Sequence, residues 1–446
     1  MPEVGDAAVI KAVRASAQRL DNGNYHALID RMAQASLVFI GEASHGTHEF
    51  YQERAEITKR LIKEHGFRGV AIDAAWPGAC RVHRYVTNRG ESRDVRDSLS
   101  GFRYFPNWIW RNRVVEEFVG WLRTHNDSLP PSQSRVGFYG FDLYGLHPSI
   151  RLILEYLDKV DSRAAARARH RYSRFDHFGE DAEPSGYATD FGLDKSSEKD
   201  LISQLTELQK RELDLVQSEG QAAQDEYIQV VQNARLVKNA ENYYREMFHG
   251  RISAWNIRET HMAQTLDALR NQLGTKNTSP KLVVWAHNLH IGDASATEFG
   301  QRGALSIGQV MRDKYEDDCF LLGFTTCSGT VTAASDWGAR AEKKALRPAL
   351  TGSYEELFHR TGLSDFLISL WDYEAATGEL KQSRLERAVG VIYRPETERP
   401  SHYFYARLSD QFDAVIHLDH TRAVDPLEFT PQPWDAETVG TFPSTF

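Results

Sequence analysis

Four strands predicted from the sequence each end in a side chain that can transfer a proton or hold a charge. These side chains are Glu42, Asp73, Asp142 and His287. If the strands are parallel, their carboxyl ends meet at one edge of the sheet, and the crevice beside that edge is where open α/β proteins bind ligands. The sequence therefore predicts a site for acid, base or electrostatic chemistry at this edge.

The loop after the first of these strands, residues 41–49, is dense in titratable groups. His45 lies three residues after Glu42, close enough for the carboxylate to orient the imidazole ring. An imidazole titrates at about pH 6.5, and a neighbouring carboxylate raises its pKa towards neutrality. His45 is therefore a candidate general base. A structural role stays open, in which Ser44 or Thr47 caps the following helix.

A second histidine pair follows another apolar strand. His287 and His290 have the same three-residue spacing as His45 and His48, and their strand should end at the same rim. The two pairs together favour chemistry over capping. They also leave open a metal site, because Zn²⁺ binds His and carboxylate ligands and Glu49 could contribute. The H-E-x-x-H spacing is absent, however, and no cysteine lies in either cluster.

A serine nucleophile is a further alternative, since Ser44 is adjacent to His45. The strained G-x-S-x-G turn that exposes such a serine is missing, because Gly41 and Gly46 flank four residues here. The sequence thus favours His45 acting on water.

Two arginines could bind a carboxylate or polarise a carbonyl group in the crevice. Arg54 lies nine residues after His45, on a helix predicted over residues 47–64, and reaches the sheet edge only if that helix starts late. Arg258 lies in a segment predicted to form one helix with Tyr243. A surface ion pair is the alternative for each arginine.

The elements that must position these residues alternate between strands and helices. Residues 36–73 predict a βαβ unit with a right-handed crossover, preceded by a helix over residues 10–20. A turn at Ser328-Gly329 predicts a hairpin, which would make the sheet mixed. The predicted strands cover residues 36–40, 69–73, 135–141, 281–286, 319–324, 330–333, 390–393 and 412–417.

Between the third and fourth strands the composition becomes typical of helices, rich in Ala, Glu, Gln, Arg and Leu. We expect a helical subdomain inserted at about residues 145–278, with a loop over residues 175–192. Residues 1–446 should then form a single α/β domain with a mixed, mostly parallel central sheet and flanking helices. The tail from Pro431 should be irregular.

The charge balance disfavours nucleic-acid binding. The 446 residues include 53 basic and 62 acidic side chains, giving a formal net charge of −9, whereas nucleic-acid binders need a basic face. Residues 163–174 contain five arginines. We interpret them as a solvated helix face; a patch for an anionic or carbonyl-rich ligand, or for nucleic acid, is the alternative.

Cys80, Cys319 and Cys327 lack metal-ligand spacing and are expected to be core thiols in a reducing compartment. The N-terminus has no signal-peptide pattern, and no apolar stretch reaches the length of a membrane span. We therefore expect a cytoplasmic protein that is not anchored to a membrane, with a monomer favoured.

Five sequence motifs, in this order, resemble those of the erythromycin esterase family. They are F-I-G-E-A-S-H at residues 39–45, F-Y-G-F-D at 138–142, W-N-I-R at 255–258 followed by H-M at 261–262, V-W-A-H-N at 284–288, and F-D-A-V-I-H at 412–417. Each motif is short, but their order over residues 36–427 is specific. The resemblance implies an α/β fold with a helical subdomain, an open cleft, and ester hydrolysis without a metal or cofactor.

The resemblance also implies roles for individual residues. His45 corresponds to the family's catalytic base and Glu42 to its carboxylate partner, while Arg54 corresponds to a conserved arginine and His287 to a later essential histidine. Where the family commonly has glutamate at the end of the second strand, this chain has Asp73, which is one methylene shorter. The residues expected to contact the substrate are His48, Asp142, Arg258, His290, Trp255 and, in the insert, Tyr187.

The substrate that the resemblance implies is a macrolide lactone, opened by a water molecule that His45 activates. Two alternatives remain. The chain could hydrolyse another ester or lactone, because a fold does not fix a substrate. It could also bind a small ligand such as haem without catalysis, since the wider superfamily resembles haem-binding lipoproteins.

Overall fold

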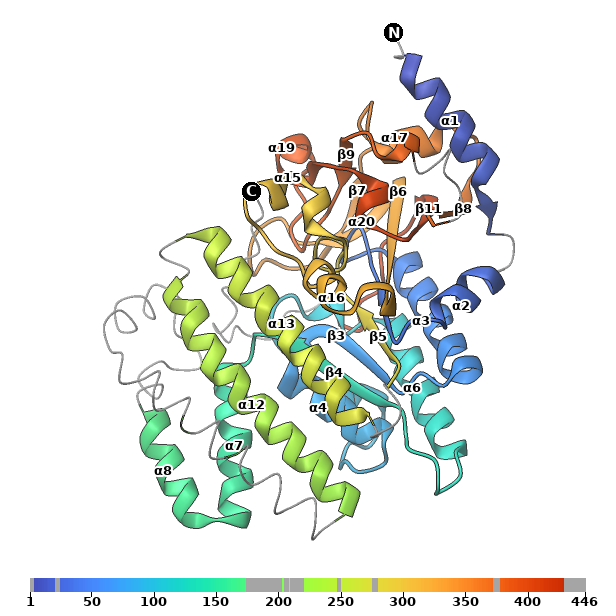
Figure 1. Ribbon diagram of the computed structural model, residues 1–446. Coiled ribbons are helices and arrows are strands. Elements are labelled where there is room, and N and C mark those ends of the chain that lie inside the picture. Colours follow the sequence, from blue (N-terminus) through green and yellow to red (C-terminus); the bar gives the residue numbers. More distant parts are fainter. Residues whose placement is uncertain are drawn as a thin grey trace.

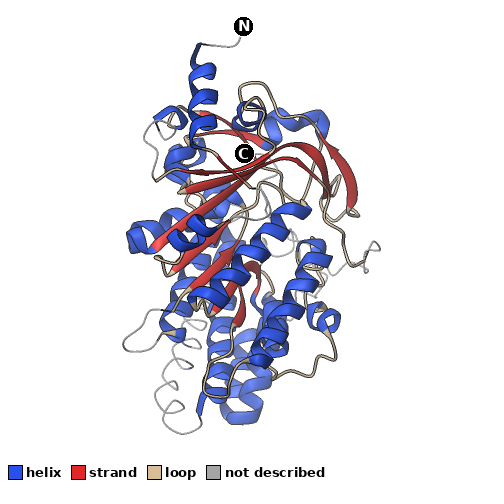
Figure 2. Cartoon of the chain, turned by 90° about the vertical axis from the view of Figure 1, so that its right-hand side faces the viewer, coloured by secondary structure: helices blue, strands red, loops and turns tan. Residues whose placement is uncertain are grey.

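A nine-stranded sheet forms the centre of the molecule, with helices on both faces (Figure 1, Figure 2). The computed structural model describes residues 4–20, 25–173, 203, 208, 220–246, 250–274, 280–371 and 378–428. In spatial order the strands are β1 (Gln18–Arg19), β8 (Asp365–Ser369), β11 (Ala414–Thr421), β6 (Cys319–Ala333), β2 (Leu37–Ile40), β5 (Leu282–Trp285), β3 (Gly69–Ala75) and β4 (Gly137–Asp142), and β7 (Glu342–Leu346) pairs with β6.

The sheet is mixed and mostly parallel, as predicted. Strands β11, β6, β2, β5, β3 and β4 are parallel to their neighbours in this row, whereas β1, β8 and β7 pair antiparallel. Because the row from β2 to β4 is parallel, the carboxyl ends of these strands lie at one edge, where the sequence places the candidate site.

Alternating side chains of the strands feed two hydrophobic cores. In β2, all of whose residues are buried, Leu37 and Phe39 join one core, and Val38 and Ile40 join the other. Burial on both faces explains why these strands read as continuous apolar runs. The first core is covered by α1 (Val4–Ser16), α13 (Arg251–Leu273), α16 (Ile307–Tyr315) and α17 (Tyr354–His359), and the second by α2 (His26–Met32), α3 (His48–His65) and α6 (Arg113–Ser128).

Four of the described helices lie between β4 and β5, in the region of the predicted helical insert. They are α7 (Leu146–Val160), α8 (Ser162–Tyr172), α12 (Gly220–Glu246) and α13. Helix α12 packs between α7 and α13, and α4 (Trp76–Val86) lies against β4 and α12 (Figure 1). The predicted loop over residues 175–192, which includes Tyr187, and the tail from Pro431 lie outside the described residues.

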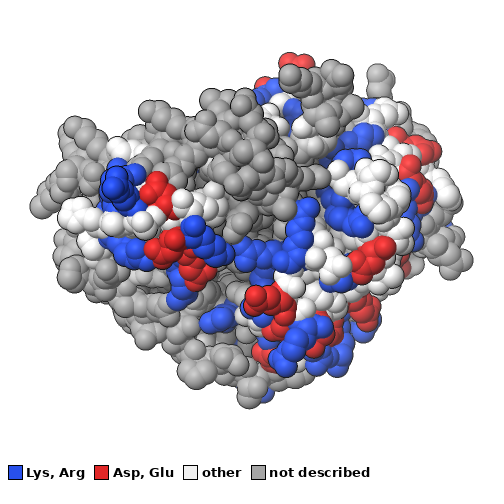
Figure 3. All heavy atoms as spheres, turned by 90° about the horizontal axis from the view of Figure 1, so that it is seen from below, with Lys and Arg blue, Asp and Glu red and all other residues white. Residues whose placement is uncertain are grey.

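The arginine-rich segment forms α8, in which Ala164, Ala165 and Ala168 are buried while Arg163 and Arg169 are exposed. Its described part is thus a solvated helix face. On the face of the molecule seen from below, Lys and Arg side chains are interspersed with Asp and Glu (Figure 3).

The remaining elements are short. A second sheet of two antiparallel strands comprises β9 (Arg384–Arg387) and β10 (Tyr403–Ala406). The short helices are α5 (Val95–Leu99), η1 (Asn107–Ile109), α14 (Asn288–Ile291), η3 (Ala294–Ala296), α15 (Glu298–Gln301), η4 (Glu316–Asp318), η5 (Pro395–Thr397), α19 (Glu398–His402) and α20 (Leu408–Gln411). None of the described helices is long and apolar enough to cross a membrane.

Two strand predictions were wrong. The hairpin at Ser328-Gly329 does not form, because β6 runs through it as one strand and pairs antiparallel with β7. Gly329 is needed for close packing, since a Cβ atom there would lie 1.8 Å from the carbonyl oxygen of Thr421, and its φ is +136°. Residues 390–393 are not a strand either; Val389 and Ile392 make only isolated bridges, to Ser44 and Ala334.

Two helix predictions were also wrong. The first helix ends at Ser16 instead of residue 20, because Gln18 and Arg19 pair with β8 as an edge strand. Tyr243 and Arg258 do not share a helix: Tyr243 lies in α12, and α13 begins after Gly250. Helices α12 and α13 pack against each other, which still brings the two segments together.

Candidate active site

The order of the strands sets the order of the candidate residues along the sheet edge. Strands β2, β5, β3 and β4 are neighbours in this order, and they carry Glu42, His287, Asp73 and Asp142 respectively. All four side chains are buried. Asp73 lies within β3, which continues to Ala75 past a register shift, so the predicted strand end was two residues early.

Two glycines allow the loop after β2 to pack tightly at this edge. A Cβ atom on Gly41 would lie 2.2 Å from Oδ1 of Asn288, and one on Gly46 would lie 1.8 Å from the carbonyl oxygen of Thr332. The backbone N–H of Asn288 also donates to the carbonyl oxygen of Glu42 at 2.9 Å. The loop is therefore held between β6 and the turn after β5, which fixes the position of His45.

His45, Glu42 and Arg54 form a buried chain of hydrogen bonds. Nδ1 of His45 lies 2.8 Å from Oε1 of Glu42, and Nη2 of Arg54 donates to Oε2 at 2.7 Å. Burial raises the pKa of Glu42, but the Arg54 charge and the His45 hydrogen bond outweigh it, so the net pKa lies below the usual value. An ionised Glu42 accepts a hydrogen bond from the Nδ1–H group of His45. The other ring nitrogen, Nε2, can then act as the base.

Arg54 reaches the sheet edge because α3 begins only at His48. Its side chain is fully buried, so the alternative of a surface ion pair is wrong. The guanidinium lies 4.4 Å from the ring centre of Tyr51 and 5.3 Å from that of Trp285. The hydroxyl of Tyr51 donates to the carbonyl oxygen of His45 at 2.7 Å. Tyr51 was not predicted, although it lies one helical turn before Arg54.

The alternative role of this loop, in which Ser44 or Thr47 caps the following helix, is only partly right. Thr47 is the residue before α3, but it makes no side-chain capping bond. Its hydroxyl bonds instead to the hydroxyl of Ser44. Ser44 is thus engaged within the loop, while His45 bonds to Glu42.

The His287 ring packs against the His45 ring, with their centres 4.9 Å apart. Nδ1 of His287 accepts the backbone N–H of Leu289 at 3.2 Å, so the neutral ring carries its proton on Nε2. Burial, together with the nearby His45, lowers the pKa of His287 well below its usual value. His287 is therefore a neutral N–H donor at neutral pH.

His290 belongs to a second buried pair. Its Nδ1 lies 2.6 Å from Oε1 of Glu259, and its ring stacks on Trp255 at 4.9 Å with an angle of 9°. Burial lowers the pKa of His290 and raises that of Glu259, which favours a neutral pair. Glu259 was not predicted; its signal in the sequence was only that it follows Arg258.

Asp142 and Arg258 form a buried bidentate ion pair. Nε and Nη2 of Arg258 each donate to one oxygen of Asp142, both at 2.8 Å. The Arg258 side chain is 1% exposed, so the alternative of a surface ion pair is wrong here as well. Arg258 lines neither cavity described below, so its charge affects the sheet edge through its contact with Asp142.

Asp73 lies between the two ion-paired carboxylates. Burial, together with the charges of Glu42 and Asp142, raises its pKa well above the usual value. Its Oδ2 accepts the backbone N–H of His287 at 3.4 Å. This environment favours the protonated carboxylic acid over the carboxylate at Asp73.

His45 lines two cavities. The larger, of about 860 Å³, also contains Asp73 and Asp142. The smaller, of about 230 Å³, contains His287 and, with it, the stacked pair His290 and Trp255. The two linings share His45, with Asp73 on the side of the larger cavity and His287 on the side of the smaller.

His48 does not join this group. Its Nε2 bonds to Oε1 of Gln52 and to Nη2 of Arg422, and the side chain lines neither cavity. His48 is the first residue of α3, and its contact with a substrate stays a prediction.

A family model described as erythromycin esterase matches residues 62–421. Among curated proteins, an erythromycin esterase type II from Escherichia coli is 22% identical over 74% of this chain and 80% of its own length. A putative hydrolase, YbfO, from Bacillus subtilis is 19% identical over 86% of this chain and 83% of its own length.

Two solved structures show the same fold. A protein from Bacillus cereus matches with a TM-score of 0.77 at 18% identity, covering 95% of this chain and 99% of its own. A variant of the erythromycin esterase EreC, in its open conformation, matches with a TM-score of 0.65 at 16% identity, covering 92% and 98%.

Removing the Asp142 charge should destabilise the protein. Asp142→Asn leaves the Arg258 guanidinium buried without a counter-charge, which we expect to cost about 3–5 kcal/mol in the free energy of unfolding. Urea unfolding measures this loss. Asp158→Asn is the matched control, because its Arg169 partner is half exposed and the expected loss is below about 1 kcal/mol. Equal losses in the two variants would contradict the interpretation.

Proposed function

Because the chain belongs to the erythromycin esterase family, we propose that it hydrolyses an ester with a water molecule activated by His45. The observation that carries the proposal is the orientation of His45. Glu42 holds its Nδ1 at 2.8 Å, and the ring lines both cavities at the sheet edge. The base, its partner and the space for a substrate thus coincide.

In this reaction Nε2 of His45 takes a proton from water while the oxygen attacks the carbonyl carbon of the ester. General-base help of this kind contributes about 10²–10⁴-fold to the rate. The buried Glu42 carboxylate stabilises the imidazolium that forms. The imidazolium then gives its proton to the departing alkoxide, so the products are a carboxylic acid and an alcohol, and no bond to the protein forms.

The tetrahedral intermediate carries a negative oxygen that needs hydrogen-bond donors. His287 offers its Nε2–H, because its Nδ1 already accepts the Leu289 N–H. Asp73 in its protonated form offers an O–H, and burial, which raises its pKa, favours that form. A buried carboxylic acid that stays neutral can serve as such a donor. We assign both residues to the oxyanion and Arg54 to holding Glu42.

The larger cavity is compatible with a macrolactone, which remains the first substrate to test. Its volume of about 860 Å³ lies in the range of drug-sized sites. Aromatic side chains suited to an apolar ring line it: Phe102, Tyr104, Phe105, Trp110, Tyr144 and Trp337.

The charges around the same cavity favour a second candidate, an ester that carries a negative group. Three of its described lining residues carry carboxyl groups: Asp142, which is paired with Arg258, Asp73, whose pKa is raised, and Glu91. Six described lining residues are basic, and one of them, Arg81, is paired with Asp97. The excess of basic side chains would attract a negative group on a substrate. The six are Arg81, Arg84, Arg89, Arg103, Arg151 and Lys159.

His45→Ala should abolish the hydrolysis of any substrate that the wild type accepts. The loss removes the base, so we expect a fall of at least about 10²-fold. Ser44→Ala should keep most of the activity, since that hydroxyl bonds only within the loop to Thr47. Mass spectrometry of macrolides of several ring sizes, before and after incubation, checks for a product heavier by one water. An inactive Ser44→Ala enzyme with a covalent adduct at Ser44 would overturn the mechanism.

If Asp73 donates its O–H to the oxyanion, the activity should be lost at alkaline pH. Activity should be present below the raised pKa of Asp73 and should fall as the pH rises through it, because the O–H donor is then lost. Asp73→Asn keeps an N–H donor that does not titrate, so this fall should disappear from the pH profile of kcat/KM. An alkaline limb unchanged in Asp73→Asn would contradict the donor role.

The preference for charge can be measured with esters of one alcohol whose acyl chains end in methyl, carboxylate or trimethylammonium groups. We expect kcat/KM to be about five- to ten-fold higher for the carboxylate than for the methyl ester, and lower for the cation. Added salt should reduce the difference. Arg84→Glu and Arg103→Glu should reduce it too, whereas Arg113→Glu, with an exposed side chain outside the cavity, should not. Equal kcat/KM values for all three esters would exclude this candidate.

A further inference from the structure

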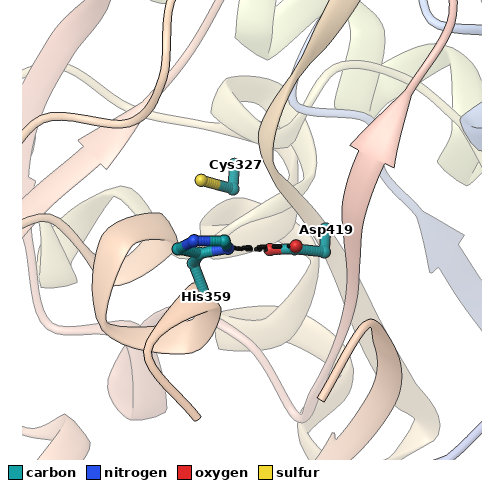
Figure 4. A group of neighbouring side chains, drawn as sticks. All are labelled: Cys327, His359 and Asp419. Atoms are coloured by element: carbon teal, nitrogen blue, oxygen red, sulfur yellow. Dashed lines mark hydrogen bonds and ion pairs between the residues drawn. The ribbon is translucent and has the colours of Figure 1, made fainter. Parts of the chain in front are cut away.

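Cys327, His359 and Asp419 lie together where α17 crosses the sheet (Figure 4). One ligand atom from each of the three residues lies within 4.8 Å of the other two. In the described part of the chain this is the one group in which three such atoms meet. None of the three residues lines the cavities beside His45. The group is therefore separate from the candidate active site.

The pairing of β6 with β11 brings Cys327 and Asp419 together. In the parallel pair of β6 and β11, Leu418 is opposite Thr326 and His420 is opposite Ser328. Cys327 and Asp419, between these positions, are thus neighbours on adjacent strands. Their spacing is built into the sheet and does not depend on a mobile loop.

His359 approaches from the helix above. It is the last residue of α17, and its Nδ1 lies 2.8 Å from Oδ1 of Asp419. Figure 4 shows the Cys327 sulfur beside this pair. The His359 side chain is 57% exposed, so an ion can reach the group from solvent.

The three side chains match the preferences of a borderline-soft divalent metal ion. Zn²⁺ binds Cys, His and carboxylate ligands with bonds of about 2.0–2.3 Å, so its tetrahedral ligands lie roughly 3.5 Å apart. Atoms that already lie within 4.8 Å of one another need to approach by little more than 1 Å. A hard ion such as Mg²⁺ would not select the sulfur ligand.

Neighbouring side chains hold the carboxylate ligand in place. Nε2 of His417 lies 3.3 Å from Oδ1 of Asp419, and Nδ1 of His417 lies 2.9 Å from the hydroxyl of Thr325. Such outer contacts orient ligands in metal sites. An ion pair between His359 and Asp419 alone does not account for the position of the Cys327 thiol beside them.

We propose that Cys327, His359 and Asp419 form a binding site for a divalent ion of the Zn²⁺ class, with a fourth position open to water. On binding, the Cys327 thiol loses its proton to solvent and the thiolate coordinates the metal. The ion would link β6, β11 and α17. The site is independent of ester hydrolysis, because no residue of it contacts the cavities.

Cobalt is the probe that reports the sulfur ligand directly. Co²⁺ added to the metal-stripped full-length protein should give a near-ultraviolet thiolate-to-cobalt charge-transfer band that saturates at one equivalent, and Zn²⁺ should displace it. Cys327→Ser should abolish the band. Cys319→Ser is the matched control, because its buried thiol lies outside the group and should leave the band unchanged.

Affinity and stability give two further readouts. Asp419→Asn and His359→Ala should each weaken Zn²⁺ binding by at least about 10–100-fold in competition with a coloured chelator. Zn²⁺ should raise the thermal unfolding midpoint of the wild type and of His45→Ala, but not of Cys327→Ser. The His45→Ala variant tests whether His45 takes part in Zn²⁺ binding. Absence of the band in the wild type, or equal Zn²⁺ affinity in wild type and Asp419→Asn, would overturn the proposal.

Discussion

The burial of the Glu42 carboxylate is the constraint on which the site depends. A charge without access to water is costly unless it is paired and hydrogen-bonded, and Glu42 is fully buried. Arg54 supplies the counter-charge and His45 the remaining bond. Arg54 must in turn be enclosed, which Tyr51 and Trp285 achieve with their rings. The start of α3, the packing against β5 and the orientation of the base all follow from keeping one carboxylate ionised.

The carboxyl groups along the sheet edge differ in their partners. Glu42 and Asp142 each have an arginine partner, whereas Asp73, between them, has none among the described residues and its pKa is raised. Placing like charges this close in a low-dielectric interior makes ionisation of the middle group unfavourable. The same row of carboxyl groups thus provides a base partner at one position and a hydrogen-bond donor at another. The difference comes from the arginines behind the row and not from the residue types within it.

Local patterns in the sequence were enough to predict the parallel strands, the edge they share and the pairing of His45 with Glu42. Contacts between distant segments were not predictable in the same way. Asp142 and Arg258 are 116 residues apart, so nothing local marks them as partners. The hairpin prediction failed because glycine is typical of turns, whereas Gly329 lies inside a strand. Its lack of a side chain allows β11 to approach closely. Tyr51 and Glu259 were missed because an aromatic residue or a charge on a helix usually signals packing or solvent.

The pairing of Asp142 with Arg258 divides the helical insert into two unequal parts. Helix α13 supplies the arginine that a buried carboxylate of the sheet requires, while α8 contributes no residue to that pair. Changes in α8 would therefore leave this ion pair intact, whereas the loss of α13 would leave the Asp142 carboxylate buried without its counter-charge. Helix α13 thus belongs to the sheet edge as much as the strands do.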